Sequence, residues 1–228
     1  MSVEANGQVG TDIQLRAKDG HVFDAYVAAP RQTPRGALVV IQDAFGVGHY
    51  IRSVCDSYCA DGYVAIAPAL YDRQQRAAVF DHSPGSHKAA ARFRADLNWD
   101  HVLADVEAAI AHVRTTGPVG ILGFCVGGSV AWLTSASLPV AAAACYYGKD
   151  IAGWLDRKPR CPTILHFGDS DHLIPLSDVE RIKRAYPDLP TCIYPAGHGF
   201  DGAGKGYHAE SAALARSRTL EFFRRHIG

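Results

Sequence analysis

The stretch GILGFCVGGSVAW, residues 120–132, joins an apolar run to a series of small residues through a single cysteine. Within it, Gly123-Phe124-Cys125-Val126-Gly127 has the form G-x-S-x-G, with cysteine in the serine position. Glycines two residues either side of the cysteine let a strand and a helix approach closely, which permits a strained turn that lifts the central side chain out of the sheet. The stretch therefore predicts a strand, a sharp turn that carries Cys125, and a helix.

Cys125 has two interpretations. It is either a buried sulfur in a glycine-rich turn or a nucleophile aimed into a cleft. A helix that starts at the next residue presents free backbone N–H groups and a partial positive charge, and both favour the thiolate over the thiol. The motif has the expected context, and an acid and a histidine follow it in the chain. These features favour the nucleophile.

The alternation of short and long apolar patterns indicates the fold class. Residues 12–17 and 21–30 predict an antiparallel hairpin. Runs typical of strands buried on both faces follow at 37–42, 63–68, 119–124, 140–148, 162–168 and 191–195. Helical patterns lie at 50–61, 98–115, 127–137, 177–186 and 206–225. We expect an α/β fold whose mostly parallel central sheet, of about eight strands, has helices on both faces. The polar stretch 72–97 predicts an irregular excursion above the sheet.

Length and composition limit the alternatives. A chain of 228 residues fits one α/β domain, so we predict a single domain over 1–228. Lys plus Arg and Asp plus Glu both number 23, so no net charge favours nucleic acid or an anionic membrane as a partner. No leader or membrane-spanning pattern is evident, and we expect a soluble cytoplasmic protein. The cysteines form no C-x-x-C pair, which argues against a disulfide framework or a zinc site.

Reactive side chains follow four of the predicted strands. Asp43 comes after 37–42, Cys125 after 119–124, Asp169 and Asp171 after 162–168, and His198 after 191–195. Ligands of such sheets bind beyond the carboxyl ends of the strands. We therefore expect these side chains to converge on one rim.

Nucleophile, acid and histidine occur in the chain order of an α/β-hydrolase triad: Cys125, Asp171 and His198. Asp171 lies further past its strand than Asp169, which we expect to brace the loop. His198 is set apart from the other histidines by a glycine on each side and by the strand before it. The backbone N–H groups of Val126 and Ala44 would form the oxyanion hole.

These residues carry a resemblance to the dienelactone hydrolase (carboxymethylenebutenolidase) family, a cysteine branch of the α/β-hydrolase superfamily. The matching segments are VVIQDAFGVGHYIR, APALYDRQ, GFCVGG, CYYG, GDSDHLIP and YPAGHGF. The resemblance implies that Cys125, Asp171 and His198 form the triad and that a dienelactone is opened to maleylacetate. It also implies that Tyr146 and Tyr147 lie near the pocket and that Arg73 binds the substrate carboxylate, as arginine does well.

The sequence departs from the family pattern at two places. Asp43 stands where the family usually has the glutamate that holds the resting cysteine. The segment HGFDGAGKG after the catalytic histidine lacks the family's second carboxylate-binding arginine; Asp201 would repel an anion there, and Lys205 is a candidate to compensate. Hydrolysis of an ester or lactone is therefore better supported than hydrolysis of dienelactone itself.

The expected chemistry is acyl transfer through a thioester on Cys125, with His198 and Asp171 activating water. We expect no metal or organic cofactor, a small-molecule lactone or ester as the partner, and a monomer or small homo-oligomer.

Other functions remain open: a carboxylesterase or lactonase of other specificity, a thiol redox sensor, and a non-catalytic homologue that binds a small ligand.

Overall fold

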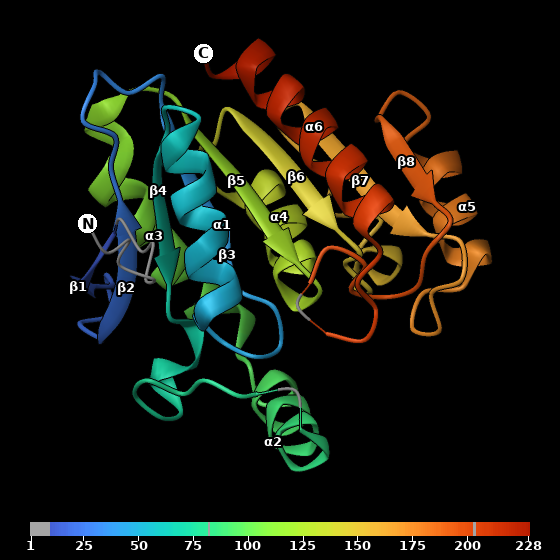
Figure 1. The fold of residues 1–228 in the computed structure, drawn as a ribbon, viewed down its shortest axis with the longest axis horizontal. Helices are drawn as coiled ribbons and strands as arrows, with labels where there is room; N and C mark the ends of the chain where they lie inside the picture. Colours follow the sequence, from blue (N-terminus) through green and yellow to red (C-terminus); the bar gives the residue numbers. More distant parts are fainter. Residues whose placement is uncertain (1–9, 82, 203) are drawn as a thin grey trace, which may run out of the picture.

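One eight-stranded sheet runs through the molecule (Figure 1). The computed structural model describes residues 10–81, 83–202 and 204–228. The strands lie in the order β1-β2-β4-β3-β5-β6-β7-β8. Their bounds are β1 (Thr11–Arg16), β2 (Val22–Ala28), β3 (Ala37–Ile41), β4 (Val64–Pro68), β5 (Val119–Phe124), β6 (Ala142–Tyr146), β7 (Thr163–Gly168) and β8 (Thr191–Tyr194).

The pairing confirms the predicted hairpin and the mostly parallel sheet. β1 and β2 form the antiparallel hairpin, and β2 also pairs antiparallel with β4. From β4 to β8 every pairing is parallel. Every residue of β3, β4, β5, β6 and β7 is buried, which is why these strands are continuous apolar runs and not alternating ones.

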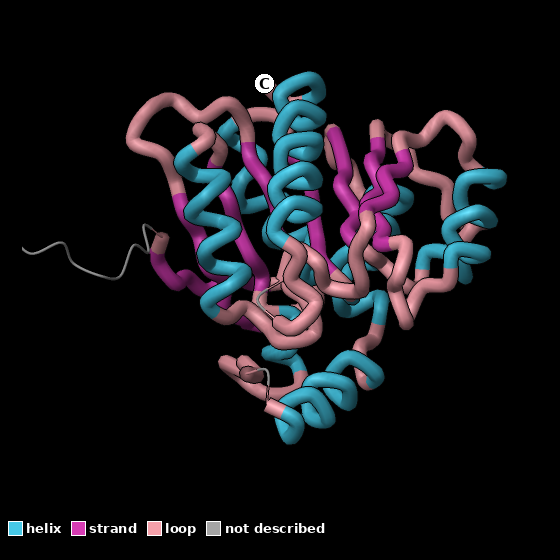
Figure 2. Tube along the Cα trace, turned by 45° about the vertical axis from the view of Figure 1, so that its right-hand side comes forward, coloured by secondary structure: helices cyan, strands magenta, loops and turns pink. Residues whose placement is uncertain are grey.

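Helices cover both faces of this sheet, as expected (Figure 2). In Figure 1, α1 and α6 lie in front of the sheet, and α3 and α4 lie behind it. The helix bounds are α1 (His49–Ala60), α2 (Pro84–Ala95), α3 (Trp99–Val113), α4 (Val126–Ser137), α5 (Leu176–Ala185) and α6 (Ala209–His226). Short 3₁₀ turns are η1 (Leu70–Arg73), η2 (Arg114–Thr116) and η3 (Ile151–Gly153). The described residues include no helix long and apolar enough to span a membrane.

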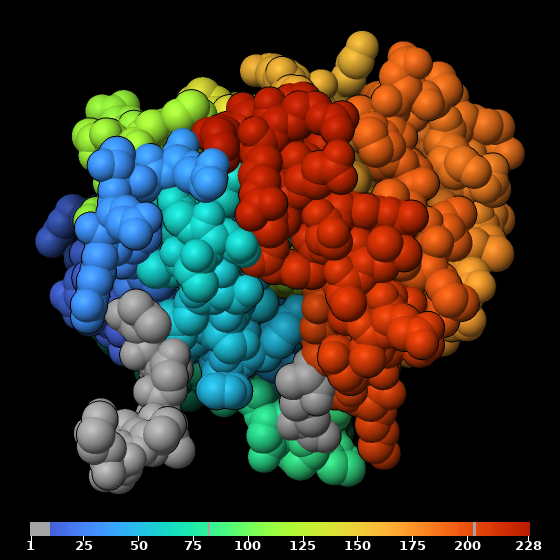
Figure 3. All heavy atoms as spheres, turned by 45° about the horizontal axis from the view of Figure 1, so that its top comes forward, coloured from blue at the N-terminus to red at the C-terminus, as the bar shows by residue number. Residues whose placement is uncertain are grey.

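α1 and α6 form one continuous surface on their face of the sheet (Figure 3). The guanidinium of Arg216, on α6, donates to the Ser57 hydroxyl of α1 at 3.1 Å. It also pairs with Asp61 and lies 3.7 Å from the centre of the Tyr58 ring. These contacts fasten the C-terminal helix to the first half of the chain.

The polar composition of the stretch 72–97 predicted an irregular segment. The structure instead shows that this stretch contains helix α2. Pro84 begins this helix, and the side chain of Ser83 accepts a hydrogen bond from the Ser86 amide at the N-cap. Among the described helix residues only Ala90 is buried, so the helix lacks the apolar stripe by which amphipathic helices are detected. α2 lies beyond the carboxyl ends of the parallel strands, so the predicted excursion is correct in position (Figure 1).

Candidate active site

Cys125 occupies a strained turn between β5 and α4. Its backbone has φ 56° and ψ −115°, a left-handed conformation that residues with a Cβ seldom adopt. A Cβ added to Gly123 would lie 2.1 Å from the Gly127 carbonyl oxygen, and one added to Gly127 would lie 2.4 Å from the Gln42 carbonyl oxygen. Both glycines are therefore required by close backbone approach, and the turn projects Cys125 from the end of the sheet.

The structure brings Cys125, Asp171 and His198 together. His198 Nδ1 lies 2.8 Å from Asp171 Oδ2, and His198 Nε2 lies 3.1 Å from Cys125 Sγ. The Asp171 side chain is fully buried and that of His198 is 10% exposed. Asp171 Oδ1 accepts hydrogen bonds from the amides of Leu173 (2.8 Å) and Ile174 (3.1 Å), which hold the carboxylate toward the imidazole.

These contacts determine the charge of His198. Burial opposes its protonation, but the hydrogen bonds to Asp171 and Cys125 outweigh that effect and raise the pKa of His198 to about 9. The imidazole is therefore cationic at neutral pH. The imidazole Nε2 lies 3.1 Å from the sulfur, within reach for proton exchange with groups that react there.

Asp169 lies outside this chain of contacts. Its carboxylate accepts a hydrogen bond from the Ser170 hydroxyl at 2.5 Å, and both residues are exposed. Its amide donates to the Tyr194 carbonyl at 2.9 Å, which ties the loop to β8. This placement agrees with the bracing role expected of Asp169.

Two backbone amides are candidates for an oxyanion hole. Val126 is the first residue of α4, so its N–H has no acceptor within the helix. Ala44 follows β3, and within the described part of the chain its amide donates no backbone hydrogen bond. Both amides are thus available as donors.

Asp43 lies beside this loop. Its Oδ1 accepts the Phe45 amide at 2.8 Å. Burial raises the pKa of Asp43 to about 6, while the Phe45 amide and the positive charge of His198 act in the opposite direction. Asp43 therefore supports the turn after β3, and its charge changes close to neutral pH.

The two adjacent tyrosines have different positions. Tyr147 packs edge-on against His198, with ring centres 5.1 Å apart, and has φ 39°. The Tyr146 hydroxyl lies 2.6 Å from the Thr219 hydroxyl, which in turn contacts His166 Nε2 at 2.9 Å. Tyr147 therefore lies against the triad, whereas Tyr146 belongs to a buried hydrogen-bond chain that joins β6, β7 and α6.

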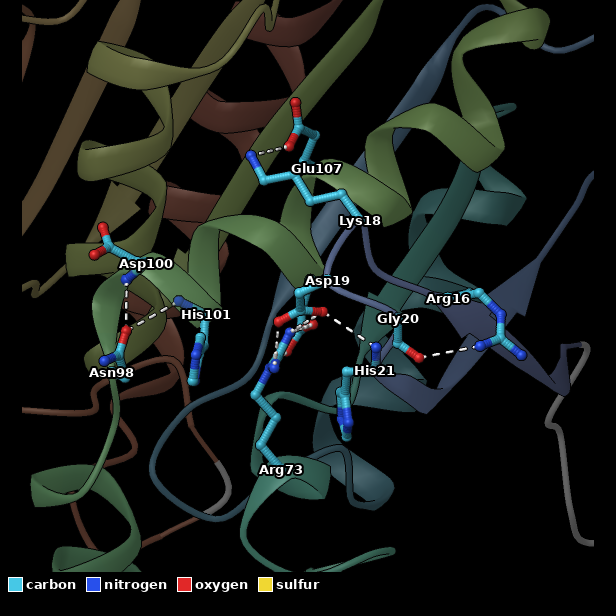
Figure 4. A network of polar contacts seen from close by, with 11 residues as sticks. Arg16, Lys18, Asp19, Gly20, His21, Arg73, Asn98, Asp100, His101 and Glu107 are labelled. Atoms are coloured by element: carbon cyan, nitrogen blue, oxygen red, sulfur yellow. Dashed lines mark hydrogen bonds and ion pairs between the residues drawn. The ribbon is translucent and has the colours of Figure 1, made fainter.

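Arg73 has partners other than a substrate carboxylate. Its Nε and Nη2 contact the two oxygens of Asp105 at 2.8 and 2.7 Å, and its Nη1 contacts Asp19 Oδ2 at 2.8 Å. Figure 4 shows the side chain directed toward Asp19 in the β1–β2 turn. All three nitrogens already have carboxylate partners. The expected substrate-binding role therefore does not fit the observed position, and Arg73 instead joins η1, α3 and the hairpin.

The loop after His198 contains an acid at the site and a lysine at the surface. Burial raises the pKa of Asp201 to about 7, and the positive charge of Arg216 lowers it in part. Burial raises the pKa of the phenols of Tyr50 and Tyr147, and the negative charge of Asp201 contributes to the same rise. Lys205 is exposed. The loop thus carries an acid, Asp201, whose raised pKa weakens the repulsion of an anion expected from its sequence position.

Two neighbours of the triad were not predicted. Tyr50, at the start of α1, packs edge-on against Phe124 at 5.4 Å, and its phenol oxygen is buried. The His172 ring lies 6.2 Å from that of His198. Tyr50 stands in a helical pattern, where an aromatic residue ordinarily indicates core packing. His172 adjoins Asp171, which is the only signal for it in the sequence.

The fold and this site define the class of protein: a carboxylic ester hydrolase with the α/β-hydrolase fold. The chain matches the dienelactone hydrolase family over residues 23–227 and belongs to it. It is 32% identical to a carboxymethylenebutenolidase of Pseudomonas putida over 222 residues, which cover 92% of this chain and 94% of that protein. It is 28% identical to a Pseudomonas sp. (strain P51) carboxymethylenebutenolidase over 225 residues, which cover 93% and 94%.

A solved structure agrees with this assignment. A crystal structure from Klebsiella pneumoniae subsp. pneumoniae MGH 78578, named "Putative Dienelactone Hydrolase", aligns with a TM-score of 0.80 and 28% identity. The alignment covers 95% of this chain and 100% of that one. The predicted fold class is confirmed.

Proposed function

We propose that this protein hydrolyses a lactone or small ester through a Cys125-His198-Asp171 triad. The observation that carries the proposal is the imidazole of His198, which contacts Asp171 at 2.8 Å and Cys125 at 3.1 Å. Because the sulfur also sits on a strained turn at a helix N-terminus, the arrangement has a nucleophile, a base and an orienting acid.

In the first half of the reaction, the Cys125 thiolate attacks the carbonyl carbon and a C–S bond forms. The amides of Ala44 and Val126 hold the resulting oxyanion. As the tetrahedral intermediate collapses, the C–O bond breaks, and the His198 cation gives its proton to the leaving oxygen. The product of this half is a thioester, which in a lactone stays joined to the opened ring.

In the second half, neutral His198 takes a proton from water, and the hydroxide attacks the thioester carbonyl. The C–S bond then breaks, and the carboxylic acid leaves with Cys125 again as the thiolate. Asp171 holds the imidazole in one orientation and stabilises its cationic form. The imidazole thus returns to its cationic resting state at the end of the cycle.

Dienelactone is the leading substrate, opened to maleylacetate, because the family and the named Pseudomonas relatives support it. Such an activity would place the protein in the breakdown of aromatic compounds. We also propose that it acts in the cytoplasm, as a monomer or small homo-oligomer. A neutral ester or lactone is the alternative. It is favoured by the pairing of Arg73 with Asp19 and Asp105, and by the acid at Asp201.

The test is steady-state hydrolysis of a dienelactone beside p-nitrophenyl acetate, with wild type, Cys125→Ala and Cys161→Ala. Cys161 is a half-buried thiol outside the triad and serves as the matched control. We expect Cys125→Ala alone to abolish turnover of whichever substrate is used. A strong preference for the dienelactone supports the leading substrate, and activity on the neutral ester alone supports the alternative. Full activity in Cys125→Ala contradicts the proposal.

A non-catalytic ligand-binding homologue would hydrolyse neither ester. A redox sensor would form a disulfide on Cys125 under mild peroxide, which mass spectrometry detects. Neither class needs the contact between His198 and Cys125, so the hydrolase is the function that the site supports best.

A further inference from the structure

The loop that carries the Ala44 amide lies outside the sheet, because β3 ends at Ile41. A peptide group in such a loop keeps one direction only if other hydrogen bonds hold it. An oxyanion donor must be aimed in advance at the position where the negative charge develops. The groups that hold this loop therefore matter to the chemistry.

The neighbours of Ala44 are held by contacts with two segments. The Asp43 carboxylate accepts the Phe45 amide at 2.8 Å, and the Phe45 carbonyl accepts the Phe80 amide at 2.9 Å. Gly46 has φ +88°, and a Cβ there would lie 2.4 Å from the Ala78 carbonyl oxygen. The segment that precedes α2 is thus packed directly against this loop.

The Ala44 carbonyl has a partner from η1. The Tyr71 hydroxyl donates to it at 3.1 Å. A hydroxyl has one proton to donate, so in this arrangement Tyr71 acts on the loop and not on a substrate oxygen. Burial raises the pKa of the Tyr71 phenol, which keeps this donor protonated.

The direction of the Tyr71 side chain is itself determined by packing. The residue is 1% exposed. Its ring lies edge-on to Phe93 at 5.4 Å and to Phe80 at 6.2 Å, and those two rings contact each other at 5.0 Å. The Gln42 side chain accepts the Leu70 amide at 3.0 Å and joins η1 to the end of β3. The phenol is therefore a rigid support for the loop.

We propose that Tyr71 is a positioning residue. By holding the Ala44 carbonyl, it fixes the Ala44–Phe45 peptide group and, through the Ala44 Cα, the adjoining Asp43–Ala44 peptide group, whose N–H then faces the oxyanion formed on Cys125. The inference rests on the proposed function. It also assigns a role to the stretch 72–97, whose Phe80 and Phe93 fix the ring that supports the oxyanion loop.

The test compares two reactions of Cys125. Acylation by p-nitrophenyl acetate, followed as the burst of p-nitrophenolate, passes through an oxyanion. Alkylation by iodoacetamide uses the same thiolate but forms no oxyanion. A defect in the thiolate slows both reactions, whereas a misdirected Ala44 amide slows only acylation.

The variant is Tyr71→Phe, which removes the hydroxyl and keeps the ring. The matched control is Tyr63→Phe, because the buried Tyr63 hydroxyl also donates to a main-chain oxygen, that of Gly228, at 2.6 Å. Gly228 is the last residue described, and this end of the chain lies at the end of the sheet opposite α2 (Figure 1). Tyr71→4-aminophenylalanine restores a donor and serves as the rescue.

We expect Tyr71→Phe to slow acylation and kcat about 10-fold, less than the loss of a direct oxyanion donor, with KM and alkylation within about twofold of wild type. Tyr63→Phe should leave both rates unchanged, and the amino variant should recover acylation. Equal loss of both reactions, or no loss of either, overturns the inference. If wild-type Cys125 is alkylated but never acylated, the proposed function fails and Tyr71 loses this role with it.

Discussion

Arg73 and Asp105 form a two-point ion pair, with contacts of 2.8 and 2.7 Å between the guanidinium and the two carboxylate oxygens. The Asp105 side chain is 1% exposed and that of Arg73 is 16% exposed. Desolvation raises the pKa of Asp105, and the hydrogen bonds to Arg73 lower it in part. The arginine therefore compensates a buried charge that would otherwise be costly.

Replacing Arg73 by Met should lower the free energy of unfolding by about 3–5 kcal/mol, because it leaves Asp105 buried without its partner. Urea unfolding measures this loss, and the double variant Arg73→Met/Asp105→Asn should recover part of it. KM for dienelactone should not change. A stable variant with a raised KM for dienelactone, and not for the neutral ester, would restore the carboxylate-binding role to Arg73.

Gly123→Ala should prevent the turn at Cys125 from forming. The new methyl group would lie 2.1 Å from the Gly127 carbonyl oxygen, which is backbone and cannot move aside alone. We expect a loss of at least about 3 kcal/mol in stability, together with loss of activity. Thermal unfolding and ester hydrolysis measure the two effects. Gly153→Ala is the matched control, because a Cβ there meets nothing within 4 Å. Equal stability of the two variants would contradict the prediction.

Cys125→Gly should be more stable than Cys125→Ala, although both lack the nucleophile. Cys125 has φ 56°, and a residue with a Cβ pays for that conformation whereas glycine does not. The difference in free energy of unfolding should be about 1 kcal/mol, measured by urea titration of the two variants. If Cys125→Ala proves as stable as Cys125→Gly, the turn stores no strain at this residue.

Asp43→Asn should stabilise the protein at high pH and not at low pH. Burial raises the folded-state pKa of Asp43 to about 6. That value lies above the pKa of about 4 in the unfolded chain, so ionisation progressively destabilises the fold as pH rises from about 4 through 6. Asparagine keeps an oxygen for the Phe45 amide and carries no charge.

The gain in stability above pH 7 should be about 1–3 kcal/mol and should vanish near pH 4. Melting temperatures of wild type and Asp43→Asn across this range measure it. Taking the difference between the two proteins removes the titration of Asp201, which both contain. A gain that is the same at every pH would show that the charge of Asp43 is not its cause.

The fold was largely predictable because its signals are local. The hairpin, the parallel strands and five of the helices follow from apolar periodicity and from the glycines around Cys125. α2 was missed because Ala90 is the one buried residue among those described in this helix, so its sequence has no apolar stripe. A single domain over 1–228 stays a prediction.

Cys125, Asp171 and His198 were selected from their places after strands, and the carboxyl ends of parallel strands necessarily meet at one edge. The contacts of 2.8 and 3.1 Å at His198 agree with that selection. The catalytic roles remain for the experiments above.

By itself, the sequence determined the strand–turn–helix at 119–137 and the order of the reactive side chains, since both depend on residues close together in the chain. Only the tertiary structure decided that Arg73 pairs with Asp105, that Tyr71 holds Ala44, and that Tyr147 and not Tyr146 faces the triad. Each of these contacts joins elements distant in sequence or depends on which way a side chain turns. Their geometry is set by how the sheet, the helices and the stretch 72–97 pack, which no local pattern encodes.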